Sequence, residues 1–381
     1  MKKKMIRITT IPNSLCGLLT GQLNFMNDHY EVIGVSSGGP MLERVKEQEG
    51  IRVIPVELTR KITLFKDLKS VYTLYKLFKN EKPFIVHSHT PKAGTAGMLA
   101  AKLAGVPHRL HTIAGLPLVE ATGFKRRILN LVEKITYACA TKIYPNSFGL
   151  QEIILAEKFT SKGKLKVIGK GSSNGIDTAY FNPECYFKED KEKLKKELDI
   201  SPGDIVYTYV GRLVTDKGIN ELIQAFKKLA TVKDNVKLLL VGFFEPELDP
   251  LDKDTLDYIY KNPKVIGVGW QDDVRPYFAI SDVFTFPSYR EGFPNVVMQA
   301  SAMQLYSIVT DINGCNEIIE EGKNGTIIPV KNADALYEQM LQFHEQKVST
   351  FNAETCRNLI IKNYERTYIW EELLKEYQSL S

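Results

Sequence analysis

The chain has 381 residues, of which 44% are hydrophobic and 25% charged, as is ordinary for a soluble globular protein of about two domains. Collagen-like, disordered and disulfide-scaffold proteins are excluded, because the sequence has no low-complexity tract and its five cysteines are scattered without a CxxC pair. Such cysteine usage favours a reducing cytosol and argues against a structural zinc site.

The net charge of +5 is unevenly divided along the chain. Residues 1–180 contain 27 Lys and Arg against 13 Asp and Glu, whereas residues 181–381 contain 23 against 32. A basic first half indicates anionic partners, such as phosphates or a membrane surface. Nucleic acid is the competing interpretation, but the basic residues are dispersed and form no patch interleaved with aromatic residues. We therefore expect no nucleic-acid partner.

Two uncharged stretches, 8–27 and 292–310, superficially resemble a signal peptide and a membrane span. Both contain too many polar residues and prolines for these roles. We expect neither to be cleaved or to cross a membrane.

Short apolar segments alternate with segments of helical periodicity through both halves of the chain, which predicts parallel sheets with helices on both faces. The helical segments include 66–79 and everything beyond residue 332. The expected strands are 5–10, 31–36, 51–56, 84–88, 109–113, 142–145 and 166–168, and then 205–210, 236–241, 264–267, 282–286, 306–310 and 326–328.

The turn-rich segment 172–183 separates the two series and marks a domain junction. We expect an N-terminal domain over 1–173, a second domain over 174–364, and a C-terminal helix at about 365–381 that packs back on the first domain. Two doubly wound domains of this kind would face a cleft at the carboxyl ends of their strands, where open α/β sheets bind ligands.

The segment GRLVTDKGINELIQAF (211–226) lies where a strand ends and a helix begins. Arg212 and Lys217 then stand beside a helix N-terminus, an arrangement suited to a diphosphate. The alternative is a solvated turn with an ordinary lysine in the first helical turn.

A second strand–loop–helix segment is FPSYREGFPNVVMQASAM (286–303). We expect the helix to begin near Pro294, with proline at the first helical position, so that the amides of Asn295 and Val296 point at an anion. Glu291 precedes the helix as an acceptor for sugar hydroxyls. Gln299 follows it by about two helical turns.

These two segments, together with NGID (174–177), resemble the retaining glycosyltransferases of the GT4-like group, which includes bacterial capsule, O-antigen and lipid-carrier sugar transferases. HSHTPKAGTAGMLAAKLAGVPHRLHTIAGLP (87–117) is similar to the acceptor-domain segment of the lipid-carrier branch. The resemblance covers nearly the whole chain. It implies the GT-B fold, in which two Rossmann-like domains face a central cleft.

The resemblance also implies roles for particular residues. Arg212 and Lys217 would bind the donor diphosphate, and Glu291 the donor sugar, these three forming the catalytic set. The amides of Phe293, Asn295 and Val296 would lie nearby. The family's second acid, which holds the ribose hydroxyls, is replaced here by Gln299, which keeps one acceptor. Gly17, in the expected loop PNSLCGLL (12–19), takes the place of a glycine-rich turn near the donor phosphates.

In the N-terminal domain, His89 and Lys92 are expected on the acceptor side. The relatives' histidine in a TxHG turn is absent here, where Thr112 to Gly115 read TIAG, and we do not transfer its role to His111. His87 and His89 form an HxH pair, for which a polar loop at a strand end is favoured over a metal site. Asp252 and Asp254 spell DxD but read as an acidic helix start. No metal ligand is assigned.

Lys125, Arg126 and Arg127 open a helix whose apolar face is formed by Ile128, Leu131, Val132, Ile135 and Tyr137. Plain packing on a core is the default interpretation of such a face. Contact with anionic lipid is the alternative, at about 1 kcal/mol per basic residue near the surface.

The sequence therefore predicts a retaining, metal-independent glycosyltransferase that needs no cofactor. It would move a hexose or N-acetylhexosamine from a nucleotide sugar, with UDP as the expected nucleotide, to a glycan acceptor such as a polyprenyl-diphosphate-linked sugar. We expect a cytoplasmic location, with peripheral attachment to the inner face of the plasma membrane. The alternatives are a nucleotide-sugar 2-epimerase of similar fold and a non-catalytic nucleotide-sugar-binding protein.

Overall fold

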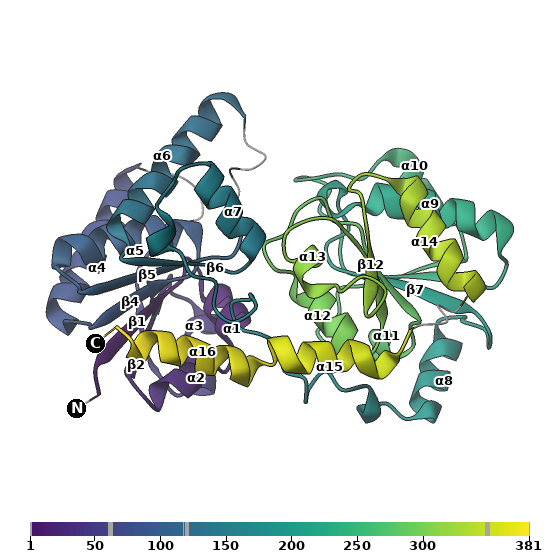
Figure 1. The fold of residues 1–381 in the computed structure, drawn as a ribbon, viewed down its shortest axis with the longest axis horizontal. Coiled ribbons are helices and arrows are strands. Elements are labelled where there is room, and N and C mark those ends of the chain that lie inside the picture. The colour runs from purple at the N-terminus through teal and green to yellow at the C-terminus, as the bar shows by residue number, and fades with distance from the viewer. Residues whose placement is uncertain (1, 60–63, 117, 119–121, 347–350, 381) are drawn as a thin grey trace. The chain divides into compact units, whose positions relative to one another are not determined.

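The structure is a computed structural model that describes all residues except 1, 60–63, 117, 119–121, 347–350 and 381. It divides into two compact units, one formed by Met1–Gly175 with Arg366–Ser381 and the other by Ile176–Glu365 (Figure 1). Each unit contains one six-stranded sheet in which all strands are parallel.

In the first unit the strand order is β3-β2-β1-β4-β5-β6. From β1 the chain adds β2 and β3 on one side, and it then crosses back to add β4, β5 and β6 on the other side of β1. The strands are β1 (Lys4–Ile8), β2 (Glu31–Ser36), β3 (Arg52–Pro55), β4 (Ile85–Ser88), β5 (His108–Ile113) and β6 (Lys142–Pro145).

The expected strand at 166–168 is wrong. Only Leu165 makes an isolated bridge with Ile143, and Gly169 and Gly171 follow at positive φ and turn the chain away.

Helices cover both faces of this sheet (Figure 1). One layer holds α4 (Leu64–Glu81), α5 (Pro91–Ala104) and α6 (Gly123–Cys139), with α4 and α6 both packed against α5. The other layer holds α1 (Pro12–Leu19), α2 (Gln22–Asn27), α3 (Pro40–Glu49) and, from the end of the chain, α16 (Arg366–Gln378). Helix α7 (Phe148–Ala156) follows β6.

The second unit repeats this plan with the order β12-β11-β10-β7-β8-β9. Its strands are β7 (Ile205–Val210), β8 (Val236–Val241), β9 (Val265–Gly269), β10 (Val283–Phe286), β11 (Tyr306–Thr310) and β12 (Gly325–Ile328). Its helices are α8 (Lys188–Glu197), α9 (Ile219–Val232), α10 (Lys253–Lys261), α11 (Arg275–Ala279), α12 (Asn295–Ala302), α13 (Cys315–Ile318), α14 (Ala333–Gln346) and α15 (Ala353–Tyr364).

Strand β7 shows why the central strands read as apolar runs without alternation. All six of its residues are buried, because helices cover both faces of the sheet. It pairs with β8 from Ile205 opposite Val236 to Val210 opposite Val241, so the two strands end at the same level. Each unit is thus a doubly wound, Rossmann-like domain, and the predicted fold class is confirmed.

Candidate active site

The site is built where β7 and β10 lie side by side in the second unit. The chain runs from β7 to one edge of the sheet and from β10 to the other, which makes this pair the topological switch point. Ligands of open α/β sheets bind beyond the carboxyl ends of the strands at such a point. Lys217 follows β7 and Glu291 follows β10, so the topology brings these two predicted residues together.

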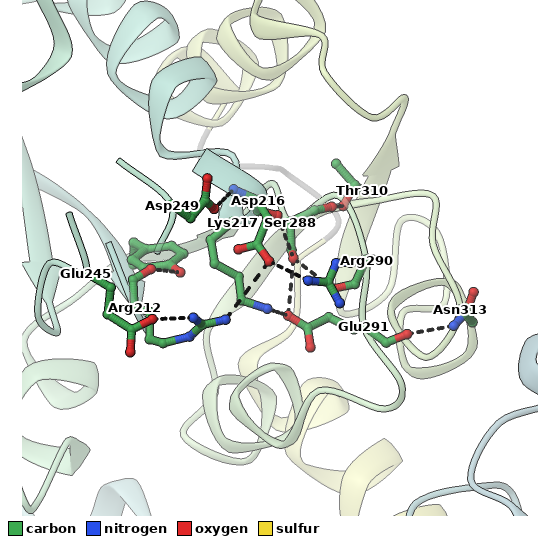
Figure 2. A network of polar contacts seen from close by, with 11 residues as sticks. Arg212, Asp216, Lys217, Glu245, Asp249, Ser288, Arg290, Glu291, Thr310 and Asn313 are labelled. Atoms are coloured by element: carbon green, nitrogen blue, oxygen red, sulfur yellow. Dashed lines mark hydrogen bonds and ion pairs between the residues drawn. The ribbon is translucent and has the colours of Figure 1, made fainter. Parts of the chain in front are cut away.

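The Lys217 Nζ lies 2.5 Å from the Glu291 Oε1 (Figure 2). The hydroxyl of Ser288 also donates to this oxygen over 3.1 Å, and the Asn313 side-chain amide donates to the Glu291 carbonyl over 2.6 Å. Glu291 is therefore fixed through both its side chain and its backbone.

A glycine makes this close approach of the two loops possible. Gly218, the N-cap of α9, has a φ of +71°, and a Cβ at this position would lie 2.0 Å from the carbonyl oxygen of Pro287. Any side chain here would push the β7 loop away from the β10 loop. The glycine after Lys217 in the DKG motif is therefore a packing requirement of the site.

Arg212 is held by two carboxylates, Asp216 of its own loop and Glu245 of the loop after β8 (Figure 2). Its Nη1 lies 2.5 Å from Glu245 Oε2 and its Nη2 lies 4.0 Å from Asp216 Oδ2. Burial acts to lower the pKa of Arg212, but the hydrogen bond to Glu245 and the charge of Asp216 outweigh it and leave this pKa raised. Asp216 also accepts from Arg290 over 3.0 Å. Arg212 and Lys217 thus both face the switch point as paired cations.

Helix α12 begins beside Glu291, one residue later than expected. Pro294 is its N-cap and Asn295 its first residue, so the prediction of proline inside the first turn is wrong. The amides of Asn295 and Val296 still belong to the first turn, where N–H groups have no intrahelical acceptor. The Phe293 ring is buried against Tyr364, which leaves only its backbone for a ligand. Gln299 lies half-buried on the same helix.

Sequence reasoning missed a pair of exposed aromatic residues at the same edge of the sheet. Phe243 follows β8 and Trp270 follows β9, and their ring centroids are 5.6 Å apart in an edge-on contact. The Leu213 amide donates to the Phe243 carbonyl over 2.8 Å, which fixes the pair next to the loop of Arg212. Their exposed fractions, 37% for Phe243 and 66% for Trp270, are the signal that only the structure supplies.

In the first unit the predicted residues have different surroundings. PNSLCGLL forms helix α1, not a loop, so Gly17 lies exposed inside a helix and makes no turn. His87 belongs to β4, so the expectation of a loop is wrong for it, whereas His89 follows the strand end; both side chains are buried. His89 accepts from Arg7 Nε over 2.9 Å, and His87 bonds Tyr377 of α16 over 2.5 Å.

Lys92, also expected on the acceptor side, lies in the first turn of α5, and its Nζ pairs with Asp67 of α4 over 2.5 Å. In the part of the chain that the structure describes, no group of three or more His, Cys, Asp or Glu residues could hold a metal ion. As expected, Asp252 precedes a helix, since it is the N-cap of α10.

The apolar face of α6 is largely exposed. Phe124, Ile128, Leu131 and Ile135 are 77, 37, 59 and 41% exposed, and their spacing places them along one stripe of the helix. Of the predicted face, Val132 is half-buried and Tyr137 buried, so plain packing holds only for the side that bears them. Among the described residues no helix is both long and apolar enough to cross a bilayer.

Profiles of two glycosyltransferase families match the chain. Residues 190–366 match glycosyl transferases group 1, and residues 18–147 match the glycosyl transferase 4-like domain. The first match covers most of the second unit, including its site, and the second covers β2 to β6 of the first unit. The fold and the two family matches together place the chain among the GT-B glycosyltransferases.

Two relatives match nearly the full length. The chain is 35% identical to the capsular polysaccharide biosynthesis glycosyltransferase CapM of Staphylococcus aureus, over 99% of this chain and 97% of the relative. It is 31% identical to an Escherichia coli UDP-Gal:α-D-GlcNAc-diphosphoundecaprenol α-1,3-galactosyltransferase, over 89% and 86%. The chain therefore belongs to the family of the group 1 glycosyl transferases and is a glycosyltransferase.

Solved structures share the fold at low identity. The Anabaena protein HepE in complex with UDP has a TM-score of 0.80 at 17% identity, with both chains covered completely. A putative UDP-N-acetylglucosamine 2-epimerase from Listeria monocytogenes reaches 0.67 at 17% identity, over 100% of this chain and 96% of that one. Because the fold occurs in both classes, the full-length sequence relatives distinguish transferase from epimerase here.

Proposed function

We propose that this enzyme transfers a hexose or N-acetylhexosamine from a UDP sugar to a polyprenyl-diphosphate-linked sugar, with retention of configuration and without a metal ion. The observation that carries the proposal is the placement of Lys217, Arg212 and Glu291 at the switch point of the second unit. The E. coli relative acts on a diphosphoundecaprenol-linked sugar with UDP-Gal, as its name states, and a Campylobacter jejuni relative acts on a similar carrier.

In the proposed reaction the bond between the anomeric carbon and the diphosphate oxygen breaks, and its electron pair stays on that oxygen. Arg212 and Lys217, with the first-turn amides of α12, would stabilise the negative charge that grows there. Glu291 would hold hydroxyls of the donor sugar. The acceptor hydroxyl forms the new bond to the anomeric carbon, and its proton passes to the departing diphosphate.

The aromatic pair completes the proposed donor site. Phe243 and Trp270 present exposed rings beyond β8 and β9, next to the loop of Arg212. A uracil base stacked there would leave the diphosphate at β7 and the sugar at β10. The donor would then lie along the carboxyl edge of one sheet.

The test is to incubate the purified protein with UDP sugars and a synthetic undecaprenyl-diphosphate N-acetylhexosamine, and to follow UDP release and product formation. UDP release that depends on the acceptor, with an α-linked product by NMR, supports the proposal. An epimerised sugar without transfer, or binding without UDP release, would contradict it.

We further propose that α6 rests on an anionic membrane surface at the cytoplasmic face. Lys125, Arg127 and Lys134 are exposed beside the apolar stripe that contains Phe124 and Leu131. A helix with an apolar stripe bordered by basic residues binds lipid interfaces both by burying apolar area and by electrostatic attraction to anionic lipids. The face of α4 that bears Phe65, Leu68 and Tyr72, exposed by 90, 65 and 56%, lies in the same helix layer and adds apolar area.

Co-sedimentation with vesicles tests this surface. Binding to phosphatidylcholine vesicles that contain about 30% phosphatidylglycerol should be lost when Phe124 and Leu131 are both changed to Ser. Val232→Ser, at a 55% exposed position of the second unit, is the matched control. Equal binding of all three proteins would exclude α6 as the contact.

A further inference from the structure

The cations of the proposed donor site are already occupied by carboxylates. In the network of Figure 2, Lys217 pairs with Glu291, Arg212 with Glu245, and Arg290 with Asp216. Asp249 adds a fourth carboxylate, which accepts from the amide of Asp216 over 2.7 Å. Three cations therefore face four carboxylates, and a diphosphate must take cations away from groups that already neutralise them.

Glu245 differs from the other carboxylates in what it holds. Asp249 accepts from a backbone amide, and Asp216 pairs with a second cation, Arg290. Glu291 is fixed by Ser288 and Asn313. The side chain of Glu245 bonds the guanidinium of Arg212, from the loop between β8 and α10. Its exposed fraction is 24% and that of Arg212 is 39%, so water can replace either partner at small cost.

Resting on the proposed function, we propose that Glu245 is an internal competitor for the donor diphosphate. It holds Arg212 while the site is empty, is displaced when the diphosphate arrives, and recaptures Arg212 as the nucleoside diphosphate leaves. Glu245 thereby lowers affinity for donor and product alike and favours product release. The alternative is that Glu245 positions Arg212 for the diphosphate, in which case its loss would weaken binding.

The sign of one measurement separates these two roles. Glu245→Gln removes the charge and nearly preserves the shape, whereas Glu247→Gln makes the same charge change two residues away at an exposed position. Binding of UDP is measured by calorimetry for both variants and the wild type, at low and high salt. Thermal melting checks that the variants are folded.

We expect Glu245→Gln to bind UDP about two- to fivefold more tightly than the wild type, as loss of a competing, partly exposed ion pair implies. The gain should shrink at about 1 M salt because the Debye length falls to about 3 Å. Unchanged or weaker binding by Glu245→Gln would overturn the inference, as would an equal gain in Glu247→Gln. If the wild type itself binds no UDP, the proposed donor site is wrong, and so is the inference about Glu245. If instead the wild type binds UDP and Lys217→Ala does not, the donor site stands whatever Glu245 does.

Discussion

Lys217 and Glu291 are 74 positions apart in the sequence, yet their charged atoms lie 2.5 Å apart at the carboxyl ends of adjacent strands. Neither side chain is more than 19% exposed, and each belongs to a loop that leads into a helix N-terminus. The contact joins a group that would bind the leaving diphosphate to one that would hold the sugar. In the proposed complex the scissile bond of the donor would lie beside this pair.

Lys217→Ala and Arg212→Ala should each reduce kcat far more than they reduce folding stability. The two cations would meet charge that grows in the transition state, where loss of one donor costs about 3–4 kcal/mol, or roughly two to three orders of magnitude in rate. Steady-state kinetics and thermal melting make the comparison. Lys228→Ala, which removes an ion pair with Asp334 from the surface of α9, is the control. Normal turnover in both variants would refute the diphosphate assignment.

Gln299→Glu should lower the KM for the donor with little change in kcat. A carboxylate would accept a stronger hydrogen bond from ribose than the amide does, and this bond exists equally in ground and transition states. Glu291→Gln should instead reduce kcat, since positive charge develops on the donor sugar as its bond breaks. Kinetics on the two variants test the pair, and the reversed pattern would show that the roles are exchanged.

Saturating EDTA should leave the rate of transfer unchanged. The expectation follows from Arg212, Lys217 and the α12 N-terminus, which together supply the positive charge that a metal ion provides elsewhere. Activity is measured before and after chelation and again with added Mn²⁺ or Mg²⁺. A loss that either ion restores would contradict the prediction.

Binding of UDP should quench the fluorescence of Trp270. The chain contains only two tryptophans, and Trp370 is 6% exposed inside the first unit, so stacking of the base would affect Trp270. Trp270→Phe should abolish the quench, whereas Trp370→Phe should retain it. Trp270→Ala should weaken UDP binding about 5- to 100-fold, as loss of one stacking platform implies. A quench that survives Trp270→Phe would place the base elsewhere.

The first unit should lose stability as the pH falls from 6.5 toward 4. Burial lowers the pKa of His111 to about 4, and it lowers those of His87 and His89 well below the usual value. The unfolded chain therefore takes up protons in this range that the folded chain does not, and stability is present above the unfolded pKa and lost below it. For His111 alone the loss approaches about 3 kcal/mol.

Thermal melting between pH 7 and 4.5 measures this effect. His111→Asn keeps an amide near the Nδ1 position that bonds the Ser88 hydroxyl and should flatten the slope. The exposed His29 offers the control, because His29→Asn should leave the slope unchanged. If His111→Asn showed the same dependence of melting temperature on pH as the wild type, the attribution of this stability loss to His111 would be wrong.

The sequence predicted the parts of this fold that depend on local patterns. The mainly apolar runs at 205–210, 236–241 and 306–310 coincide with β7, β8 and β11, because a strand covered by helices on both faces is largely apolar. Gly17 was misplaced because LCGLL can form a helix as readily as a turn, and His87 because a polar residue in a short apolar strand resembles a strand end.

Arg212, Lys217, Glu291 and Gln299 could be proposed as candidates from the sequence because each lies in a motif that couples a strand end to a helix start. Glu245, Phe243 and Trp270 could not, since their importance depends on exposure and on loops brought together by β7, β8 and β9. The exposed stripe of α6 is a similar case: its periodicity was visible, but which side faces solvent depends on how α6 packs against α5.

Helix α16 belongs to the first unit although it follows the whole second unit in the sequence. Tyr377 bonds His87 across 290 positions, and Glu376 pairs with Lys166 and accepts from the Tyr144 hydroxyl over 3.2 Å. On the ribosome, the first 175 residues would emerge with this surface uncovered, and the 190 residues up to Glu365 take about 10–40 s to follow. The second unit can fold during this delay, whereas the first is completed only once α16 has been synthesised. A protein truncated before Arg366 should therefore expose the buried histidines to solvent and become a substrate for proteases and chaperones.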